Sequence, residues 1–250
     1  MKLFSKHCVF AIIYSLFSSF ANSTESINLY TYHQKPPFIV DNDRHEGFYF
    51  SLAELLSKEN SGVDYQLYYV PRKRLDVMLS RPDFDGIVLG AVPAWFKDKL
   101  KTKYLWSDGY FEDKDHFVSL KTQKFEHVKG RPLKNVTVGK VAGLYYKGVT
   151  EQIKRGELLS VETTTELAIL KLIEKSRVDV GIISDSAFKY YQSKGYVEHI
   201  FHLSSIPHDE FNRRAFTTKN NHKAFATFQK QLKQLMQSEK LQNLVSYYTD

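Results

Sequence analysis

The spacing of apolar residues predicts a regular alternation of strands and helices in the first half of the chain. Residues 27–32 alternate between apolar and polar side chains, as a half-buried strand does, and residues 65–70 return as a second strand. Apolar residues recur at helical spacing across 48–56 and again across 75–79. A short apolar run at 87–89 follows a turn rich in proline, aspartate and glycine. The predicted order is therefore strand, helix, strand, helix, strand.

The second half of the chain repeats this plan. We expect a strand at 136–138, a loop at 139–143 and a helix from about Leu144. Thr163 and Glu166 stand three positions apart, as the two residues of a capping box do, just before an apolar helical run. Alternating strands and helices predict an α/β fold with mainly parallel sheets flanked by helices, in which ligands bind beyond the carboxyl ends of the strands. The other predicted elements are strands at 159–161, 178–183 and 215–217, and helices at 167–173, 186–191, 225–236 and 241–248.

The first residues have the pattern of a secretory signal. Two lysines precede a ten-residue apolar run at 8–17, and small or polar residues follow it. This pattern predicts a signal peptide over residues 1–23, cleaved after either Ala21 or Ser23. The run is too short for a membrane-spanning helix, which takes roughly 20 apolar residues. Cys8, the single cysteine, lies inside the run. We therefore expect a cysteine-free periplasmic protein that is held together by a hydrophobic core.

Composition and motif content exclude several classes of function. The chain has 35 basic and 28 acidic residues, but the basic ones are scattered, which favours a solvated surface over a nucleic-acid site. No Gly-x-Ser-x-Gly elbow is present, and a mature chain without cysteine has no thiol nucleophile. His199 and His202 are three positions apart, but no carboxylate is dependably placed beside them, so a zinc site is not expected. We expect no cofactor and no nucleic-acid partner.

Several short stretches carry a resemblance to a known family. Together they resemble the family 3 extracellular solute-binding proteins of bacterial ABC importers, the amino-acid-binding type. The stretches follow the family's order across nearly the whole mature chain, and their specificity lies in the ordered set. They are Tyr32 to Phe38 with its Pro-Pro-Phe, Gly47-Phe48, Val70-Pro71 with Arg74-Leu75, Trp106-Ser-Asp-Gly-Tyr-Phe111, and Arg177-Val-Asp179 leading to Asp185.

The resemblance implies a fold and a function. It implies two α/β lobes, the first from residues 24–109 plus 209–250 and the second from 110–208, joined by two hinge crossings with 104–111 in one of them. It implies a monomeric periplasmic protein, not an enzyme, that closes on a small polar or anionic amino-acid-like solute and delivers it to the membrane permease of an ABC importer. Two alternatives remain open: the same clamp serving a membrane sensor, and a dehydratase-like enzyme on this fold.

The resemblance also implies contacts with the charged groups of an amino acid. A carboxylate after a second-lobe strand binds the ligand's amino group, and Asp185 stands at that position, although it could instead cap the following helix. An arginine after the strand ending near Gly90 normally holds the ligand's carboxylate, but this chain has none there. Lys97 or Lys99 could supply the charge without the planar fork of arginine. The departure makes an ordinary α-amino acid a less secure expectation.

Other candidates lie in three loops of the first lobe. Arg72 and Arg74 place positive charge at a helix N-terminus, which is unfavourable there. We therefore expect one of them to face the cleft and bind an anionic group. Tyr32 and His33 lie close to the position where the family stacks an aromatic ring on the ligand, and Trp95 lies in a loop that supplies ligand contacts in the family.

One further candidate lies in the second lobe. The loop 140–146 is expected to end at a helix start, where free backbone N–H groups favour an anion. The family uses this loop for the ligand's carboxylate, so Gly143 and Leu144 become candidate contacts. Tyr145 could form a wall of the cleft or pack against the protein.

Overall fold

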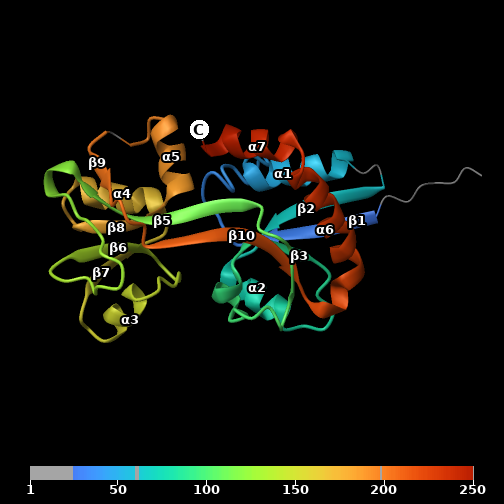
Figure 1. Ribbon diagram of the computed structural model, residues 1–250, viewed down its shortest axis with the longest axis horizontal. Coiled ribbons are helices and arrows are strands. Elements are labelled where there is room, and N and C mark those ends of the chain that lie inside the picture. Colours follow the sequence, from blue (N-terminus) through green and yellow to red (C-terminus); the bar gives the residue numbers. More distant parts are fainter. Residues whose placement is uncertain (1–24, 60–61, 198, 250) are drawn as a thin grey trace, which may run out of the picture.

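The computed structural model describes residues 25–59, 62–197 and 199–249, so the predicted signal peptide lies outside the described residues. Two lobes lie side by side along the longest axis of the molecule, and β5 and β10 run between them (Figure 1). Within the described ranges, no helix has the length and apolar character needed to cross a membrane. The strands are β1 (Glu25–Thr31), β2 (Val63–Tyr69), β3 (Ile87–Ala91), β4 (Leu105–Trp106), β5 (Phe111–Leu120), β6 (Thr137–Val141), β7 (Leu159–Thr163), β8 (Val180–Ser184), β9 (Phe201–Leu203) and β10 (Asp209–Thr217). The helices are α1 (Phe48–Glu59), α2 (Arg72–Leu79), α3 (Val149–Lys154), α4 (Glu166–Glu174), α5 (Asp185–Ser193), α6 (His222–Met236) and α7 (Glu239–Thr249).

The strands follow one continuous order, β2-β1-β3-β10-β5-β8-β6-β7. In the first lobe β1 pairs in parallel with β2 and β3, and in the second β6 pairs in parallel with β7 and β8. The two central strands are antiparallel to each other, with Arg213 opposite Phe111 and Asp209 opposite Asp115. The end of β10 turns to β3 and β4 in the first lobe, where Phe216 pairs with Trp106. The chain therefore crosses between the lobes on two paired strands.

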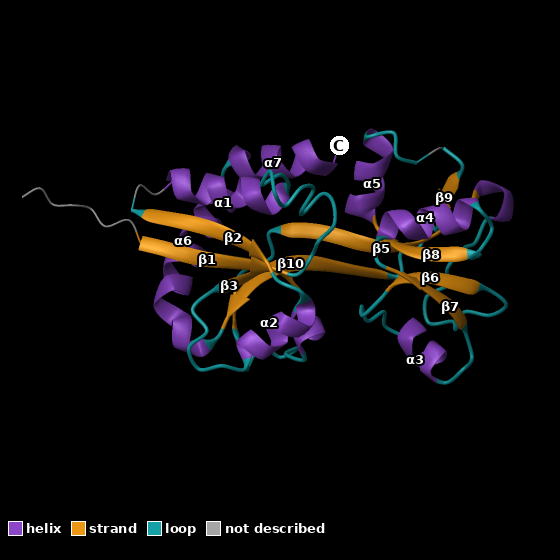
Figure 2. Ribbon diagram, turned by 180° about the vertical axis from the view of Figure 1, so that it is seen from behind, coloured by secondary structure: helices purple, strands orange, loops and turns teal. Residues whose placement is uncertain are grey.

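Helices cover both faces of each part of the sheet, as Figures 1 and 2 show. In the first lobe, α1, α6 and α7 pack on one face and α2 on the other, so neighbouring residues of β3 are buried in different cores: Leu89 against the first group and Val88 against α2. In the second lobe, α4 and α5 cover one face and α3 lies on the other. Gly181 lies under α4, where a Cβ would come 2.3 Å from the Ile169 side chain. This arrangement confirms the two-lobed, mainly parallel α/β fold.

The start of α3 and the cap of α4 differ from the sequence prediction. The loop expected at 139–143 is partly strand, because β6 continues to Val141 in parallel register with β7. The helix expected from Leu144 begins instead at Val149, after a glycine cap with a positive φ of 78°. Thr165, not Thr163, caps α4, since its side-chain oxygen accepts a hydrogen bond from Ala168 N at 3.2 Å. Both predictions are wrong because they rest on a local sequence pattern, whereas the bounds of these elements depend on the neighbouring strand or turn.

The two crossing strands were largely missed. β5 was not predicted, and β10 begins at Asp209 instead of near Ala215. Their crossing segments carry charged residues at positions that a single sheet with one solvent face would leave apolar. Asp113 and Arg213 are both buried there, because each is the partner of the other. The charged residues that prevent these strands from being predicted are accommodated in the fold because the residues of one strand pair with those of the other.

Candidate functional site

A buried ion pair joins the two crossing strands. Arg213 on β10 donates to Asp113 Oδ2 on β5 from Nη2 at 2.7 Å and from Nε at 3.2 Å, and both side chains are 1% exposed. The hydroxyl of Ser186, in the first turn of α5, donates to the same oxygen at 2.8 Å, and its backbone N–H donates to Oδ1 at 3.2 Å. Burial alone would raise the pKa of Asp113, but the positive charges of Arg213 and Lys35 outweigh it and hold the pKa below its usual value.

The other side of the Arg213 guanidinium faces the first lobe. Its Nη1 lies 3.2 Å from His33 Nε2 and 3.4 Å from the Gly90 carbonyl oxygen, and its central carbon lies 4.2 Å from the centre of the Phe38 ring. The same carbon lies 5.7 Å from the centre of the Trp95 ring. Burial lowers the pKa of His33 well below its ordinary value, and the charge of Arg213 adds to this effect, so the imidazole is neutral. A neutral ring beside a fixed cation gives this corner one positive charge.

A second cation reaches from the first lobe into the second. The ammonium group of Lys35, in the loop after β1, donates to Glu166 Oε1 at 2.5 Å and to Ser184 Oγ at 2.9 Å. Glu166 is the first residue of α4, and Ser184 ends β8 and caps α5. The Ser184 hydroxyl also lies 3.0 Å from Glu166 Oε2. Lys35 therefore contacts two side chains of the second lobe that are hydrogen-bonded to each other.

Asp115 is the third carboxylate of the group. Burial raises its pKa to about 7, and the negative charges of Glu166 and Asp113 add to the rise, while Lys35 opposes it. Among the described residues, no side chain or N–H forms a hydrogen bond with this carboxylate. We call Lys35, Asp113, Asp115, Glu166 and Arg213 the inter-lobe cluster. Asp113 pairs with Arg213 and Glu166 with Lys35, which leaves the Asp115 carboxyl group without a cationic partner of its own in the described part of the chain.

Three of the predicted ligand contacts lie beside the inter-lobe cluster. His33 touches Arg213, as described, and the rings of Tyr32 and Trp95 lie 4.1 and 6.1 Å from the His33 ring, centre to centre. Tyr32 is buried, and burial raises its pKa far above its usual value. Trp95 is half-buried and also packs on Phe211 at 4.9 Å. These aromatic rings lie beside Arg213 and His33, and their contact with a ligand stays a prediction.

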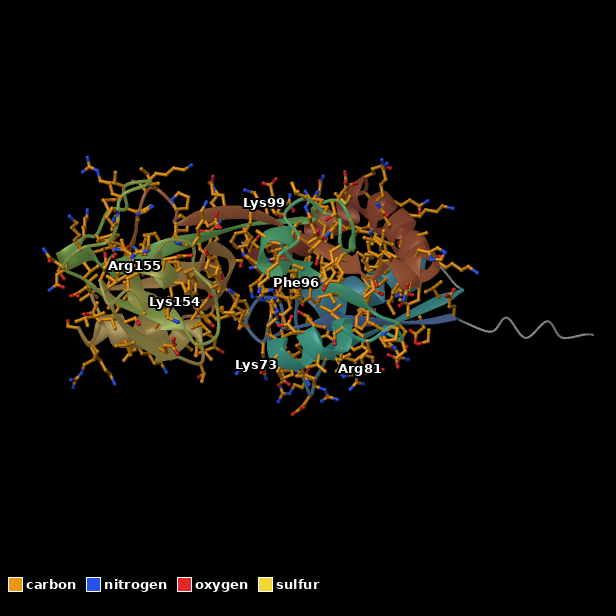
Figure 3. The ribbon with its side chains drawn as sticks, turned by 90° about the horizontal axis from the view of Figure 1, so that it is seen from below. Lys73, Arg81, Phe96, Lys99, Lys154 and Arg155 are labelled. Atoms are coloured by element: carbon orange, nitrogen blue, oxygen red, sulfur yellow. The ribbon has the colours of Figure 1, made fainter. Side chains whose placement is uncertain are left out.

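The cations predicted near the site lie elsewhere or are already engaged. Arg72 donates to Asp76 Oδ1 at 3.0 Å and to the Trp95 carbonyl oxygen at 2.8 Å, and it stacks on Phe96 at 3.9 Å. Arg74, Lys97 and Lys99 are exposed. Figure 3 shows Lys99 at the surface of the first lobe and Phe96 in the same lobe, beneath it in that view. None of these four cations belongs to the inter-lobe cluster.

The second-lobe candidates have other partners than the members of the cluster. Asp185 is the first residue of α5, so it is not the cap, and its carboxylate lies 3.1 Å from Lys189 Nζ and 3.7 Å from His116 Nε2. Gly143 and Tyr145 are exposed and Leu144 half-buried, in a turn that ends before α3 begins. These residues therefore have no helix N-terminus behind them, and Leu144 N donates to the Val141 carbonyl. Their roles as ligand contacts stay predictions.

The histidines near the end of the second lobe each have another partner. His202 Nε2 lies 2.8 Å from Glu126 Oε1, and His208 Nε2 lies 2.9 Å from the Lys147 carbonyl oxygen. In the part of the chain that the structure describes, no group of three or more histidine, cysteine or acidic residues is arranged to hold a metal ion.

The members of the inter-lobe cluster were absent from the sequence predictions. In the sequence, Lys35 precedes two prolines that indicate only a loop, and Glu166 fits the pattern of a capping box. The signal that was available is the Asp-x-Asp spacing at 113 and 115, since two carboxylates on the same face of a strand are unusual in a core. Recognising it would have required β5 to be predicted first.

Comparisons with known proteins bear on the fold. No protein-family model and no curated protein matches the sequence. Among solved structures, the GluR0 ligand-binding core in complex with L-glutamate matches with a TM-score of 0.70 at 13% identity, over 91% of this chain and 100% of that one. The substrate-binding protein of an ABC uptake transporter from Streptococcus pneumoniae, with bound histidine, gives 0.69 at 15% identity, over 91% and 93%.

A third structure extends the comparison. The ancestral amino acid-binding protein AncCDT-1, a precursor of cyclohexadienyl dehydratase, matches with a TM-score of 0.67 at 17% identity, over 90% of this chain and 96% of that one. At such identities the likeness concerns the fold alone. The chain therefore has the two-lobed periplasmic-binding-protein fold that its resemblance to the family 3 solute-binding proteins implied.

Proposed function

We propose that this protein is a periplasmic solute-binding clamp that closes on a small polar, amino-acid-like solute and delivers it to an ABC importer. The observation that carries the proposal is the inter-lobe cluster, in which Lys35 of the first lobe and Glu166 of the second meet beside residues of both crossing strands. A ligand held between two lobes favours their closed arrangement by as much as it prefers that arrangement over the open one. The lobes proposed to close are residues 24–109 plus 209–250 and residues 110–208.

The charges of the cluster favour a ligand that carries an amine. Arg213 and Lys35 are matched by Asp113 and Glu166, which leaves Asp115, whose pKa burial raises to about 7, without a cationic partner of its own among the residues that the structure describes. An ammonium group placed there would stabilise the charged form of Asp115 and offset its burial. This assigns to Asp115 the contact that the resemblance gave to Asp185. An anionic group of the same ligand would be bound by Arg72 or Arg74 only after Arg72 gives up its present contacts.

The proposal is tested by ligand-induced stabilisation of the chain without its predicted signal peptide. Amino acids, amines, dicarboxylates and polar metabolites are screened by thermal shift, and hits are confirmed by calorimetry. A ligand at 100 times its dissociation constant stabilises by about 2.7 kcal/mol, which is readily detected. Asp115→Asn should abolish binding of an amine-bearing hit, whereas Asp83→Asn, at an exposed position, should not. If no compound of any class stabilises the protein, the clamp hypothesis is wrong.

Two further roles are separated by the same hits. The first is a clamp that serves a membrane sensor, and the second is an enzyme, for which the likeness to a precursor of cyclohexadienyl dehydratase supports a search for turnover. Uptake of the labelled hit by cells, lost when the protein is deleted, indicates an importer; unchanged uptake with altered signalling indicates a sensor. Product formation from a stabilising compound would indicate an enzyme. Secretion of the mature chain to the periplasm is checked by fractionation.

A further inference from the structure

The contact between Lys35 and the second lobe differs from an ordinary surface ion pair. Its residues are 131 positions apart in the chain and belong to different lobes. The Glu166 side chain is 3% exposed and that of Lys35 is 16% exposed, so solvent screens the pair little. Ser184, which also accepts from Lys35, is fully buried. Such a pair is sensitive to the loss of either partner.

The acceptor side of this contact is formed by the second lobe alone. Glu166 opens α4, where a negative charge is favourable beside the helix N-terminus. Its Oε2 accepts hydrogen bonds from the hydroxyl of Ser184 at 3.0 Å and from the backbone N–H of Ser184 at 3.4 Å. Both groups are therefore held in place without any contribution from the first lobe. The ammonium of Lys35 is the part that arrives from outside.

The donor side is fixed within the first lobe. The Lys35 carbonyl accepts from Ile39 N at 3.0 Å, and the Pro37 carbonyl accepts from Phe48 N, the first residue of α1, at 2.8 Å. The same loop carries Val40, which packs against the apolar cluster that α4 and α5 form in the second lobe. A cavity of 190 Å³ lies next to Val40, between α5 and α7, where the lobes face each other. Lys35 and Val40 thus place a polar and an apolar contact on the opposite lobe from one short, anchored loop.

We propose that Lys35 is a positioning residue that fastens the two lobes together, because its ammonium bridges the first lobe to the Glu166–Ser184 pair of the second. Closure is then favoured by a contact within the protein as well as by a solute. When the binding-competent arrangement is more populated, the apparent affinity for a solute rises in proportion. The consequence for affinity rests on the proposed function, whereas the effect on lobe closure does not.

Lys35 also brings a positive charge into a region that holds several carboxylates. Groups that face its ammonium are Glu166 and Ser184 from α4 and β8, with Asp113 and Asp115 on β5 close enough to interact electrostatically. Without the lysine, three carboxylates would share this region with the single cation of Arg213. Removing Lys35 therefore removes the bridge and adds repulsion among the carboxylates of the second lobe.

The test measures the distance between lobes in the absence of any solute. The predicted mature chain lacks cysteine, so dyes can be attached at Lys73→Cys in α2 and Lys154→Cys in α3. Both lysines are exposed, one on each lobe (Figure 3). Single-molecule energy transfer and small-angle X-ray scattering then compare wild type with Lys35→Met and Glu166→Gln. Lys58→Met is the control, since the Lys58–Glu54 pair lies wholly within α1.

Both cluster variants should raise the ratio of open to closed molecules at least tenfold and increase the radius of gyration, while the control should do neither. The exchanged pair Lys35→Glu with Glu166→Lys should be more closed than either single charge reversal. Circular dichroism identifies any variant that has not folded, and Glu166→Gln then serves in place of Lys35→Met. Wild-type distances in both variants, or no recovery in the exchanged pair, would overturn the inference. Because no solute is present, this outcome is independent of whether the screen for a ligand succeeds.

Discussion

Replacement of Asp115 by asparagine is expected to stabilise the protein at pH 8 and to leave its stability unchanged near pH 4. The folded state keeps the carboxyl proton up to a pKa of about 7, whereas the ordinary pKa of aspartate is 3.8. Between these pH values the folded state binds one more proton than the unfolded chain, so the free energy of unfolding falls as pH rises. A difference of about three units at 1.36 kcal/mol per unit gives about 4 kcal/mol. Part of the side chain is exposed to solvent, which makes this figure an upper bound.

The assay is urea denaturation of wild type and Asp115→Asn at half-unit steps from pH 4 to pH 8. The neutral amide mimics the protonated carboxyl, so the two curves should coincide at pH 4 and separate steadily up to about pH 7. Asp83→Asn, at an exposed position, controls for the loss of one surface charge. Parallel curves, or a variant less stable than wild type at pH 8, would refute the reasoning. Such a result would mean that Lys35 and Arg213 already stabilise the ionised Asp115 carboxylate.

Three other substitutions test the framework around the site, each by urea denaturation. Arg213→Met should cost about 3–5 kcal/mol because it leaves Asp113 buried and unpaired, and adding Asp113→Asn should cost much less than a second, independent loss. Asp98→Ala should cost about 2–4 kcal/mol, since this buried carboxylate accepts from three backbone N–H groups and one indole N–H; a loss below 1 kcal/mol would show that water replaces it. Gly90→Ala should lower the free energy of unfolding by at least about 2 kcal/mol, because φ is +76° and the new Cβ would lie 2.0 Å from a buried tyrosine hydroxyl. Gly156→Ala, at φ +71° in open space, should lower it by only about 1 kcal/mol. Equal losses in the two variants would show that the contact with the tyrosine adds nothing to the cost.

The fold was predictable where burial follows a local period. Helices such as α1 and α6 each present a continuous apolar stripe to one core, so the spacing of Phe48, Leu52 and Leu56 was enough to identify the first of them. β5 has no such period, because Asp113 and Asp115 occupy the positions where a half-buried strand would carry apolar residues. The burial of Asp113 depends on Arg213, which lies 100 positions further along the chain. No local pattern carries that information.

The site was predictable only as a region. His33 and Trp95 do lie beside the inter-lobe cluster, since both follow strands whose carboxyl ends point toward the other lobe. Their neighbour Arg213 is 180 positions from His33, and its pairing with Asp113 spans 100 positions. The topology of the sheet decides which side chains meet across such separations. A capping motif or a charged helix turn is a local pattern and does not predict that topology. The ligand-binding roles given to Arg72, Arg74, Asp185 and the loop 143–145 remain predictions.

The shared strand β10 has a consequence for the order in which the molecule can be assembled. β3 has β10 as its neighbour on one side, and the core of the first lobe includes Phe225, Phe228 and Leu232 of α6, all of which come after the second lobe in the chain. The amino-terminal segment of that lobe therefore emerges from synthesis without its last strand and two of its helices. Its apolar surface stays incompletely covered until the carboxyl end arrives, and contacts of such long sequence separation form slowly. The first lobe can therefore complete its sheet and its core only after the whole second lobe has been synthesised.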